Sequence, residues 1–254
     1  MAKLDLTLDP PIMNAAGALG FFPDLHGPLD WSHFGAFVTN PLSLAPRTPA
    51  RGERFVAYPG GFLLHTGYPN PGLSQALRRF ARQWSRSPVP LIVHLLVRSP
   101  DEVAQMARRL EGLEGVGGVE IGLPTDASPE LVAGCVQACG GELPVIARLP
   151  FERAIELAPR AIQAGAMAVS LAPPRGICPA EAGGPVQGRL YGPAILPIAL
   201  RLVQELVKLG LPTIGSGGIY THEHYNAMLS IGALAVQVDS VLWKWSGYRV
   251  LERA

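Results

Sequence analysis

Residues 211–240, LPTIGSGGIYTHEHYNAMLSIGALAVQVDS, contain two short apolar runs on either side of a segment long enough for a helix. The runs are PTIGSG (212–217) and AVQVDS (235–240), and their apolar residues are continuous rather than strictly alternating. Continuous apolar runs are typical of strands covered on both faces, as in a parallel sheet flanked by helices. This stretch therefore predicts a strand, a helix and a second, parallel strand.

Six more runs of the same kind precede this unit, with helical segments between them. One such segment opens with Ser99 as a predicted N-cap and Pro100 in the first turn, and another ends at Gly165. Eight alternating units predict a single-domain (β/α)8 TIM barrel over residues 1–254, whose active site lies at the C-terminal ends of the strands. An open doubly wound sheet is the alternative. The six runs are PIMNAAG (11–17), AFVTN (36–40), LIVHLL (91–96), GVEIGL (118–123), PVIARL (144–149) and AVSLAP (168–173).

Two segments fall outside this alternation. The start of the chain, within residues 1–10, alternates apolar and polar residues and predicts a short hairpin that caps the bottom of the barrel. Residues 41–72 are rich in proline, glycine and arginine and predict a long irregular loop after the second strand. Such a loop is either a lid over the active site or a solvated surface excursion.

The composition limits the partners. A net charge of +1 gives no long-range field toward nucleic acid or an anionic membrane, so small molecules are the expected partners. Three cysteines are too few for a disulfide scaffold, and no run of about 18 apolar residues could span a bilayer. We expect a soluble, cytoplasmic protein. No cluster of His, Cys and carboxylates has metal-site spacing, so no metal is predicted.

The glycine pair Gly217 and Gly218 ends the seventh strand, and VDS (238–240) ends the eighth. Glycine lets the backbone approach a ligand with its N–H groups exposed, and barrels often hold a phosphate between these two loops. The pair predicts a phosphate site. A tight turn from strand to helix would also use glycine and is the structural alternative.

The C-terminal quarter carries a longer pattern. From residue 188, Gly-x-x-x-Gly-Pro-Ala-Ile-x-Pro-Ile-Ala-Leu leads to Ile-Gly-x-Gly-Gly-Ile and then to Gly-Ala-x-x-Val-Gln-Val. This region, 188–243, resembles the class 1 dihydroorotate dehydrogenases, flavin-containing barrels of pyrimidine synthesis. Three earlier segments are similar to that family in the same order, so the resemblance covers nearly the whole chain: PPIMNAAGALG (10–20), GAFVTNPLSLAPRTP (35–49) and PGGFLLHTGYPNPG (59–72).

The resemblance implies FMN at the top of the barrel. The sequence departs from the family in the charged residues around that place. Asp239 stands where the family usually has glycine, and a carboxylate there would repel the phosphate unless it turns away. Asn40 and Arg148 stand at the family's two flavin-contacting lysines. Arg148 either keeps a positive charge beside the flavin or pairs with Glu120 on the adjacent strand. The implied cofactor-binding residues are Ala16, Gly17, Asn40, Arg148, Gly192, Gly217, Gly218, Asp239 and Ser240.

The family's catalytic cysteine after strand four has no counterpart in GLPTDAS (122–128). Four positions that hold substrate-binding asparagines in the family lack an amide here, so dihydroorotate would meet a site of the wrong polarity. The predicted substrate pocket comprises Leu64, His65, Gly122, Thr125 and Pro173.

The catalytic base stays unassigned. Ser128 has the pattern of a helix N-cap, and nothing marks Cys178 as a low-pKa thiol. His65 and His94 are expected to face the mouth of the barrel, where each is either an acid–base group or a structural residue.

Two functions follow. The first is a dihydroorotate dehydrogenase-like, FMN-dependent oxidoreductase with altered or lost dihydroorotate chemistry, in the form of a homodimer as is frequent in the family. The second is a catalytically inactive barrel with a binding or assembly role, including the binding of a phosphorylated ligand.

Overall fold

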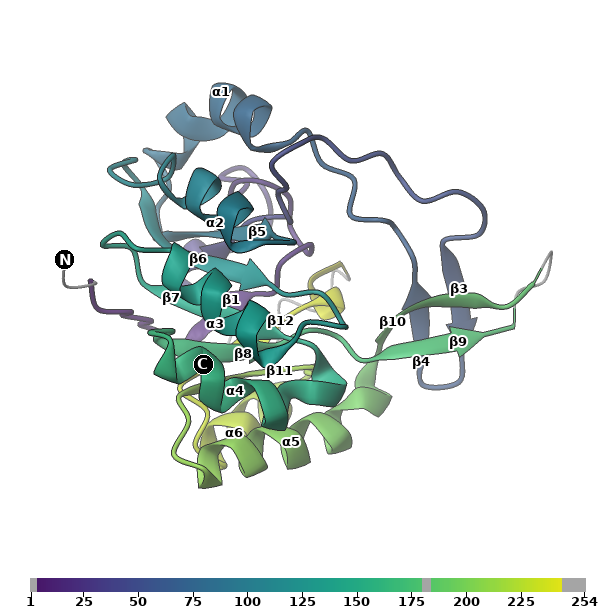
Figure 1. Ribbon diagram of the computed structural model, residues 1–254. Helices are drawn as coiled ribbons and strands as arrows, with labels where there is room; N and C mark the ends of the chain where they lie inside the picture. The colour runs from purple at the N-terminus through teal and green to yellow at the C-terminus, as the bar shows by residue number, and fades with distance from the viewer. Residues whose placement is uncertain (1–3, 180–183, 244–254) are drawn as a thin grey trace.

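Eight parallel strands form the central ring of the protein (Figure 1). The computed structural model describes residues 4–179 and 184–243. In the sheet the strands follow the order β1-β12-β11-β8-β7-β6-β5-β2, and a parallel bridge between Met13 and Ala36 closes the ring. This confirms the predicted (β/α)8 barrel and all eight predicted strands. The strands are β1 (Ile12–Asn14), β2 (Phe37–Val38), β5 (Leu91–Leu96), β6 (Val116–Gly122), β7 (Val145–Leu149), β8 (Ala168–Leu171), β11 (Thr213–Ser216) and β12 (Ala235–Val238).

Helices lie on the outside of the ring (Figure 1). Ser99 caps α2 by accepting a hydrogen bond from the Glu102 N–H, as predicted, and Ser128 caps α3 in the same way through Leu131. Between β1 and β2 the described chain has only a short 3-10 helix, Trp31–His33, in place of an α-helix. The helices are α1 (Leu73–Trp84), α2 (Pro100–Ala107), α3 (Pro129–Ala138), α4 (Ala154–Gln163), α5 (Leu196–Lys208) and α6 (His222–Ser230). In the part of the chain that the structure describes, none of the helices has the length and apolar character needed to cross a membrane.

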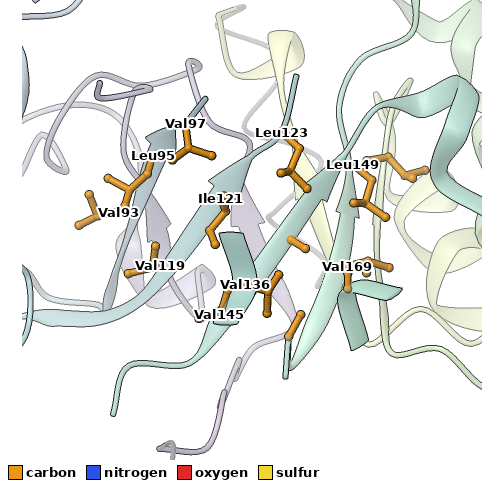
Figure 2. Close-up of a cluster of buried hydrophobic side chains, with 14 of the residues drawn as sticks. Val93, Leu95, Val97, Val119, Ile121, Leu123, Val136, Val145, Leu149 and Val169 are labelled. Atoms are coloured by element: carbon orange, nitrogen blue, oxygen red, sulfur yellow. The ribbon is translucent and has the colours of Figure 1, made fainter. Parts of the chain in front are cut away.

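Apolar side chains on the outer face of the strands form the main core. Figure 2 shows Val93 and Leu95 of β5 beside Val119 and Ile121 of β6, with Val136 of α3 packed against the strands. A second cluster fills the lower interior of the barrel and is contributed by the inward face of the strands: Met13, Ala36, Val38, Ile92, Ile146, Ala168, Ile214 and Ala235.

A buried polar layer lies directly above this inner apolar cluster. Side chains on a strand point to the same face every second residue, so the residue two positions beyond an inner apolar residue also points inward. On the strands from β5 to β12 those next inward residues are polar, and all are buried: His94, Glu120, Arg148, Ser170, Ser216 and Gln237. The barrel interior is therefore dry below and polar at its C-terminal end.

A four-stranded antiparallel sheet stands beside the C-terminal end of the barrel, at the right of Figure 1. It consists of β3 (Phe55–Tyr58), β4 (Gly61–Leu64), β10 (Val186–Tyr191) and β9 (Arg175–Cys178), in that order. The prediction of an irregular loop over residues 41–72 is wrong in this part, because β4 finds its partner in β10, more than 100 residues further along the chain.

The start of the chain also differs from its prediction. Residues 4–10 contain no strand, and the first three residues of the expected hairpin lie outside the described part. Leu6 and Leu8 pack instead against the inner apolar cluster of the barrel. The alternating pattern is satisfied by this contact, so the segment covers the barrel bottom without pairing with itself.

Candidate functional site

Three cavities meet at the C-terminal end of the barrel. The first, which we call the mouth cavity, has a volume of about 490 Å³ and is bordered by His94, Gly122 and Arg148 on the strands and by Arg47 and Tyr68 on the loop after β2. The second cavity measures about 160 Å³, and the third, the glycine cavity beside Gly217 and Gly218, only about 10 Å³. Arg148 borders all three, which places it at the centre of the site.

The structure distributes the predicted residues among these cavities. The second cavity brings together Ala16, Gly17, Asn40, Leu64, Arg148 and Asp239. The mouth cavity brings together Gly122, Thr125, Arg148 and Pro173, and the glycine cavity contains Arg148, Pro173, Gly217, Gly218 and Asp239. Most of the predicted cofactor and substrate positions therefore do converge on one end of the barrel.

Three predicted residues lie elsewhere. His65 borders a separate hollow with Arg51 and Glu53, so the expectation that it faces the barrel mouth is corrected. Gly192 has a φ of 130°, and a Cβ there would clash with the backbone of Gly60, so glycine is required for packing against β4. Ser240 is buried and does not border any of the three cavities.

Glu120 is the centre of the buried polar layer. It is 0% exposed, and its carboxylate accepts hydrogen bonds from Ser170 Oγ and Gln237 Nε2, each at 2.7 Å to Oε1. Its Oε2 lies 2.6 Å from His94 Nδ1 and 3.6 Å from Arg148 Nη1. These partners come from four strands other than β6, so the carboxylate ties the upper part of the barrel together.

The protonation states follow from these contacts. Burial by itself would raise the pKa of Glu120, but the hydrogen bond from His94 and the charge of Arg148 outweigh it and lower that pKa to about 2. Burial lowers the pKa of His94, although the contact with Glu120 opposes the change. At neutral pH the pair is therefore an ionised carboxylate and a neutral imidazole.

Asp239 occupies one of the donors that the sequence was expected to offer to a phosphate, the Ser240 N–H. Its Oδ1 accepts a hydrogen bond from the Ser240 N–H at 2.5 Å and another from Ser240 Oγ at 3.0 Å. Ser240 Oγ is also 2.7 Å from the Tyr220 hydroxyl. Burial raises the pKa of Asp239, and the two bonds from Ser240 oppose the change. The carboxylate therefore faces its own backbone rather than turning away from the site.

Arg189 and Tyr191 enter the site from β10, and sequence reasoning missed both. The Arg189 guanidinium lies 3.8 Å from the centre of the Tyr68 ring and donates to the Tyr191 hydroxyl at 3.3 Å and to Thr66 Oγ1 at 3.1 Å. The Tyr191 ring stacks on Phe62 with their centres 5.3 Å apart. Both side chains are buried, so β10 fills part of the barrel mouth.

The glycine pair is needed for packing in this fold. Gly217 and Gly218 have φ values of 103° and 74°. A Cβ on Gly217 would lie 3.2 Å from Ile195, and one on Gly218 would overlap the backbone N of Leu196 at the start of α5. The structural alternative, a tight turn from strand to helix, is thereby sufficient to explain both glycines.

Other candidates have structural roles. Asn40 Oδ1 accepts a hydrogen bond from the Gly20 N–H at 3.1 Å and so fixes the loop after β1. Ser128 is an N-cap, and Cys178 is buried in β9. Within residues 4–179 and 184–243, no group of three or more His, Cys, Asp or Glu side chains is arranged to hold a metal ion.

No protein-family model matches the chain, but curated relatives do. The catalytic subunit of dihydroorotate dehydrogenase B (NAD(+)) from Desulforudis audaxviator is 32% identical over 263 residues, which cover 94% of this chain and 85% of that protein. The chain belongs to the class 1 dihydroorotate dehydrogenase family. The same subunit from Pelobacter propionicus is 32% identical over 258 residues, or 92% of this chain and 84% of its own.

The fold of the family is also evident from a solved structure. Dihydroorotate dehydrogenase from Eimeria tenella, in complex with ferulenol, superposes with a TM-score of 0.73 over 95% of this chain and 79% of that chain. The two sequences are 15% identical, so this likeness bears on the fold alone. The resemblance stated from the sequence is confirmed at the level of family and fold.

Proposed function

We propose that this member of the dihydroorotate dehydrogenase family binds an anionic small molecule in the mouth cavity and has lost the FMN-dependent oxidation of dihydroorotate. The observation that carries the proposal is the state of Arg148. Its side chain is buried, with the residue only 6% exposed, and yet its guanidinium makes no hydrogen bond within the described residues.

The ion-pair partner of Arg148 among the described residues does not satisfy it, and Asp239 acts on it only at longer range. Glu120 lies at 3.6 Å, beyond hydrogen-bond distance, and already accepts three shorter hydrogen bonds. The Arg148 nitrogens are not among the fully buried atoms without a partner, so the free N–H groups of the guanidinium open onto the cavities and can donate to a ligand there. Because Arg148 borders the mouth cavity, an anion bound there would supply an acceptor.

The charge around the mouth cavity supports the same ligand class. Arginines outnumber acidic side chains on its walls, and a guanidinium presents paired donors that match carboxylate and phosphate oxygens. Two of the arginines, Arg148 and Arg189, are buried, which limits screening by solvent. The charged residues on the walls are Arg47, Arg98, Arg148, Arg175, Arg189, Glu102 and Glu152.

The residues present do not fit FMN in the position that the family resemblance implies. The glycine cavity, at about 10 Å³, has room for roughly one water molecule and not for a phosphate. The Ser240 N–H is bonded to Asp239, whose carboxylate would repel a phosphate when ionised. Tyr191 borders both the second and the glycine cavity and separates the space that a flavin would need to span.

The residues that replace the substrate asparagines also do not fit dihydroorotate. Gly122, Thr125 and Pro173 border the mouth cavity and Leu64 the second cavity, and none offers an amide. No cysteine is among the described residues on the walls of the mouth cavity. A site built to bind a pyrimidine through amides would lose much of its affinity with these replacements.

An FMN-dependent oxidoreductase is the second candidate. Family membership favours it, as does the second cavity, where Ala16, Gly17 and Asn40 line one wall beside Arg148. FMN binding in that place would need Tyr191 and Asp239 to move. A homodimer and a cytoplasmic location stay predictions.

Calorimetric titration with inorganic phosphate and with citrate tests anion binding. For whichever of the two anions binds more tightly, we expect Arg148→Met to weaken the affinity by about 10-fold to 100-fold, because a hydrogen bond to a charged group contributes about 1.5–3 kcal/mol. Arg201→Met is the matched control, since Arg201 is exposed on α5 and paired with Glu205. The proposal fails if neither anion binds, or if Arg148→Met and Arg201→Met bind equally well.

Flavin titration separates the two candidates. The purified protein mixed with FMN is expected to leave the flavin free, with its fluorescence unquenched and its absorption spectrum unshifted. Quenching that saturates with one FMN per chain would establish the second candidate and overturn the argument from the glycine cavity.

A further inference from the structure

His94 presents one edge of its imidazole ring to the mouth cavity. The residue is 2% exposed and lies on β5 at the level of Glu120 on β6, with which it pairs in register. Its Nδ1 is engaged with Glu120, whereas its Nε2 makes no hydrogen bond within the described residues. His94 is among the residues that border the cavity.

Glu120 determines which nitrogen of His94 carries the proton. An ionised carboxylate only accepts hydrogen bonds, so Nδ1 must be the protonated nitrogen at this 2.6 Å contact. The neutral ring then has a bare lone pair on Nε2. This is the tautomer and orientation that a general base requires.

Gly122 makes the space for this edge of the ring. A Cβ built on Gly122 would lie 2.5 Å from His94 Nε2 and 2.9 Å from Cε1. No positive φ requires glycine at this position, so the close approach of His94 is the physical reason for it. Any larger residue at 122 would force the imidazole to rotate or shift.

We propose that His94 and Glu120 form an acid–base dyad that transfers a proton to and from an anionic carbonyl compound in the mouth cavity. The inference rests on the proposed function, because the same cavity must hold the ligand. Nothing in the family resemblance assigns a base to this position.

The step balances without an oxidant. A proton leaves a carbon next to the carbonyl group and forms a bond to His94 Nε2. The electron pair of the broken C–H bond forms a C=C bond, and the π pair of the carbonyl group moves onto its oxygen. The resulting imidazolium is stabilised by Glu120, and the oxyanion by the free N–H groups of Arg148. Both partners approach the same Glu120 oxygen, at 2.6 and 3.6 Å, so the base and the guanidinium flank one wall of the cavity. Return of the proton to the oxygen gives the enol tautomer, and its return to the opposite face of the same carbon gives the epimer, so either completes an isomerisation.

The first test measures the state of His94 directly. Nitrogen NMR of the protein with labelled histidine is expected to show one ring with a protonated Nδ1 and a bare Nε2 at neutral pH. Glu120 and Arg148 are the charged groups that face this ring, and burial lowers the pKa of His94, so the neutral form should persist below the ordinary histidine pKa of 6.5. A ring protonated on Nε2 instead would overturn the proposal.

The second test measures access to Nε2 with diethyl pyrocarbonate, which acylates neutral imidazole nitrogens. Peptide mass spectrometry is expected to find His94 acylated in the native protein. Saturating inorganic phosphate is expected to slow this acylation. In Gly122→Ala the rate at His94 should fall up to about tenfold, the effect of an off-rotamer cost near 1.4 kcal/mol. Gly118→Ala, on the same strand but in contact with Pro144, is the matched control and should leave the rate unchanged.

The outcomes separate this inference from the proposed function. If phosphate binds but His94 is not acylated, or is acylated equally in Gly122→Ala, His94 is a structural residue and the dyad is wrong. If His94 is acylated with the expected tautomer but neither phosphate nor citrate binds, the anion site is wrong and the reactive imidazole stands.

Discussion

Replacement of Glu120 by glutamine is the most informative change to the buried polar layer. The substitution keeps the shape of the side chain and removes its charge. Gln237 and Ser170 can still donate to the remaining oxygen, but the new NH₂ group then faces Arg148 and the ring of His94. Arg148 is left buried without an opposite charge in contact.

The expected loss of stability in Glu120→Gln is large for a substitution that replaces one oxygen by an NH₂ group. Removal of one partner from a buried ion pair typically costs about 3–5 kcal/mol, because the other charge stays buried and uncompensated. The lowered pKa gives a similar value: an ordinary glutamate at 4.5 and Glu120 at about 2 differ by about 3 kcal/mol in the free energy of unfolding. For a domain of this size that corresponds to a drop in Tm of roughly 6–12 °C.

The same pKa fixes the pH dependence of the effect. Because the folded-state pKa of Glu120 is below its unfolded value, its contribution is complete above pH 4.5 and is lost as the pH falls toward about 2. At pH 3 about half of it should remain. The lowered pKa of His94 acts in the same direction, with stability lost as the pH falls below its ordinary value of 6.5.

Urea unfolding followed by circular dichroism measures these quantities at pH 7 and pH 3. Glu156→Gln is the control, since Glu156 forms an exposed pair with Arg153 on the surface and should contribute no more than about 1 kcal/mol. We expect Glu120→Gln to lose about 3 kcal/mol at pH 7, and the gap to the wild type to narrow at pH 3.

Two results would refute this reasoning. Equal stability of Glu120→Gln and wild type at pH 7 would mean that the carboxylate is not ionised in the folded barrel. A gap that does not change between pH 7 and pH 3 would mean that the cost arises from hydrogen-bond geometry alone.

Three further changes probe other parts of the molecule. Asp239→Gly should free the Ser240 N–H, enlarge the glycine cavity and give FMN quenching that the wild type lacks, with riboflavin still free, as measured by flavin fluorescence; equal effects on both flavins would contradict the assignment. Gly192→Ala places a Cβ against Gly60 and should expose the four-stranded sheet to limited proteolysis, whereas Gly112→Ala, with nothing near its Cβ, should not. Burial raises the pKa of Cys135 to about 11, so iodoacetamide at pH 8 should leave Cys135 unmodified until the protein is unfolded; rapid labelling of the native protein would show that it opens there.

The barrel could be predicted because its signals are local. Each strand is a continuous apolar run, and caps such as Ser99 and Ser128 mark helix starts within a few residues. The sheet beside the barrel could not, because β4 and β10 are joined by pairing between residues such as Leu64 and Arg189. The hairpin of β3 and β4 did carry a local signal, because FVAY and GFLL stand on either side of Pro59-Gly60, but only the fold brings β4 and β10 together.

Part of the site was also predictable from local signals in the sequence. Residues at strand ends, such as Gly122 and Asp239, can be placed by counting strands. Arg189 and Tyr191 could not, because they reach the barrel mouth through the sheet that the sequence concealed. The pairing of Arg148 with Glu120 was one of two alternatives, and the 3.6 Å distance gives Arg148 a charge contact without a hydrogen bond.

A missed signal was the alternation within the barrel strands. His94, Glu120 and Arg148 each stand two residues beyond an inward position in the apolar layer, at Ile92, Gly118 and Ile146. Counting in twos from the apolar layer would have put the three side chains on one inner level. The register between neighbouring strands, which decides their contacts, comes only from the structure.

The arrangement of side chains at the mouth cavity favours a site with a new chemical function over a site that has only lost the function of the family. A site that merely decays should leave many buried polar groups without partners, whereas in this described layer Gln237 Oε1 is the fully buried side-chain atom that lacks one. Here Gly122 stands where the family has an asparagine, and the ring of His94 occupies the space that a side chain at 122 would take. Glu120 in turn is paired on both oxygens. Arg148 is buried, makes no hydrogen bond within the described residues, and borders the cavity. A base held in one tautomer and a guanidinium awaiting an acceptor, on the same wall, are the parts of a proton-transfer site.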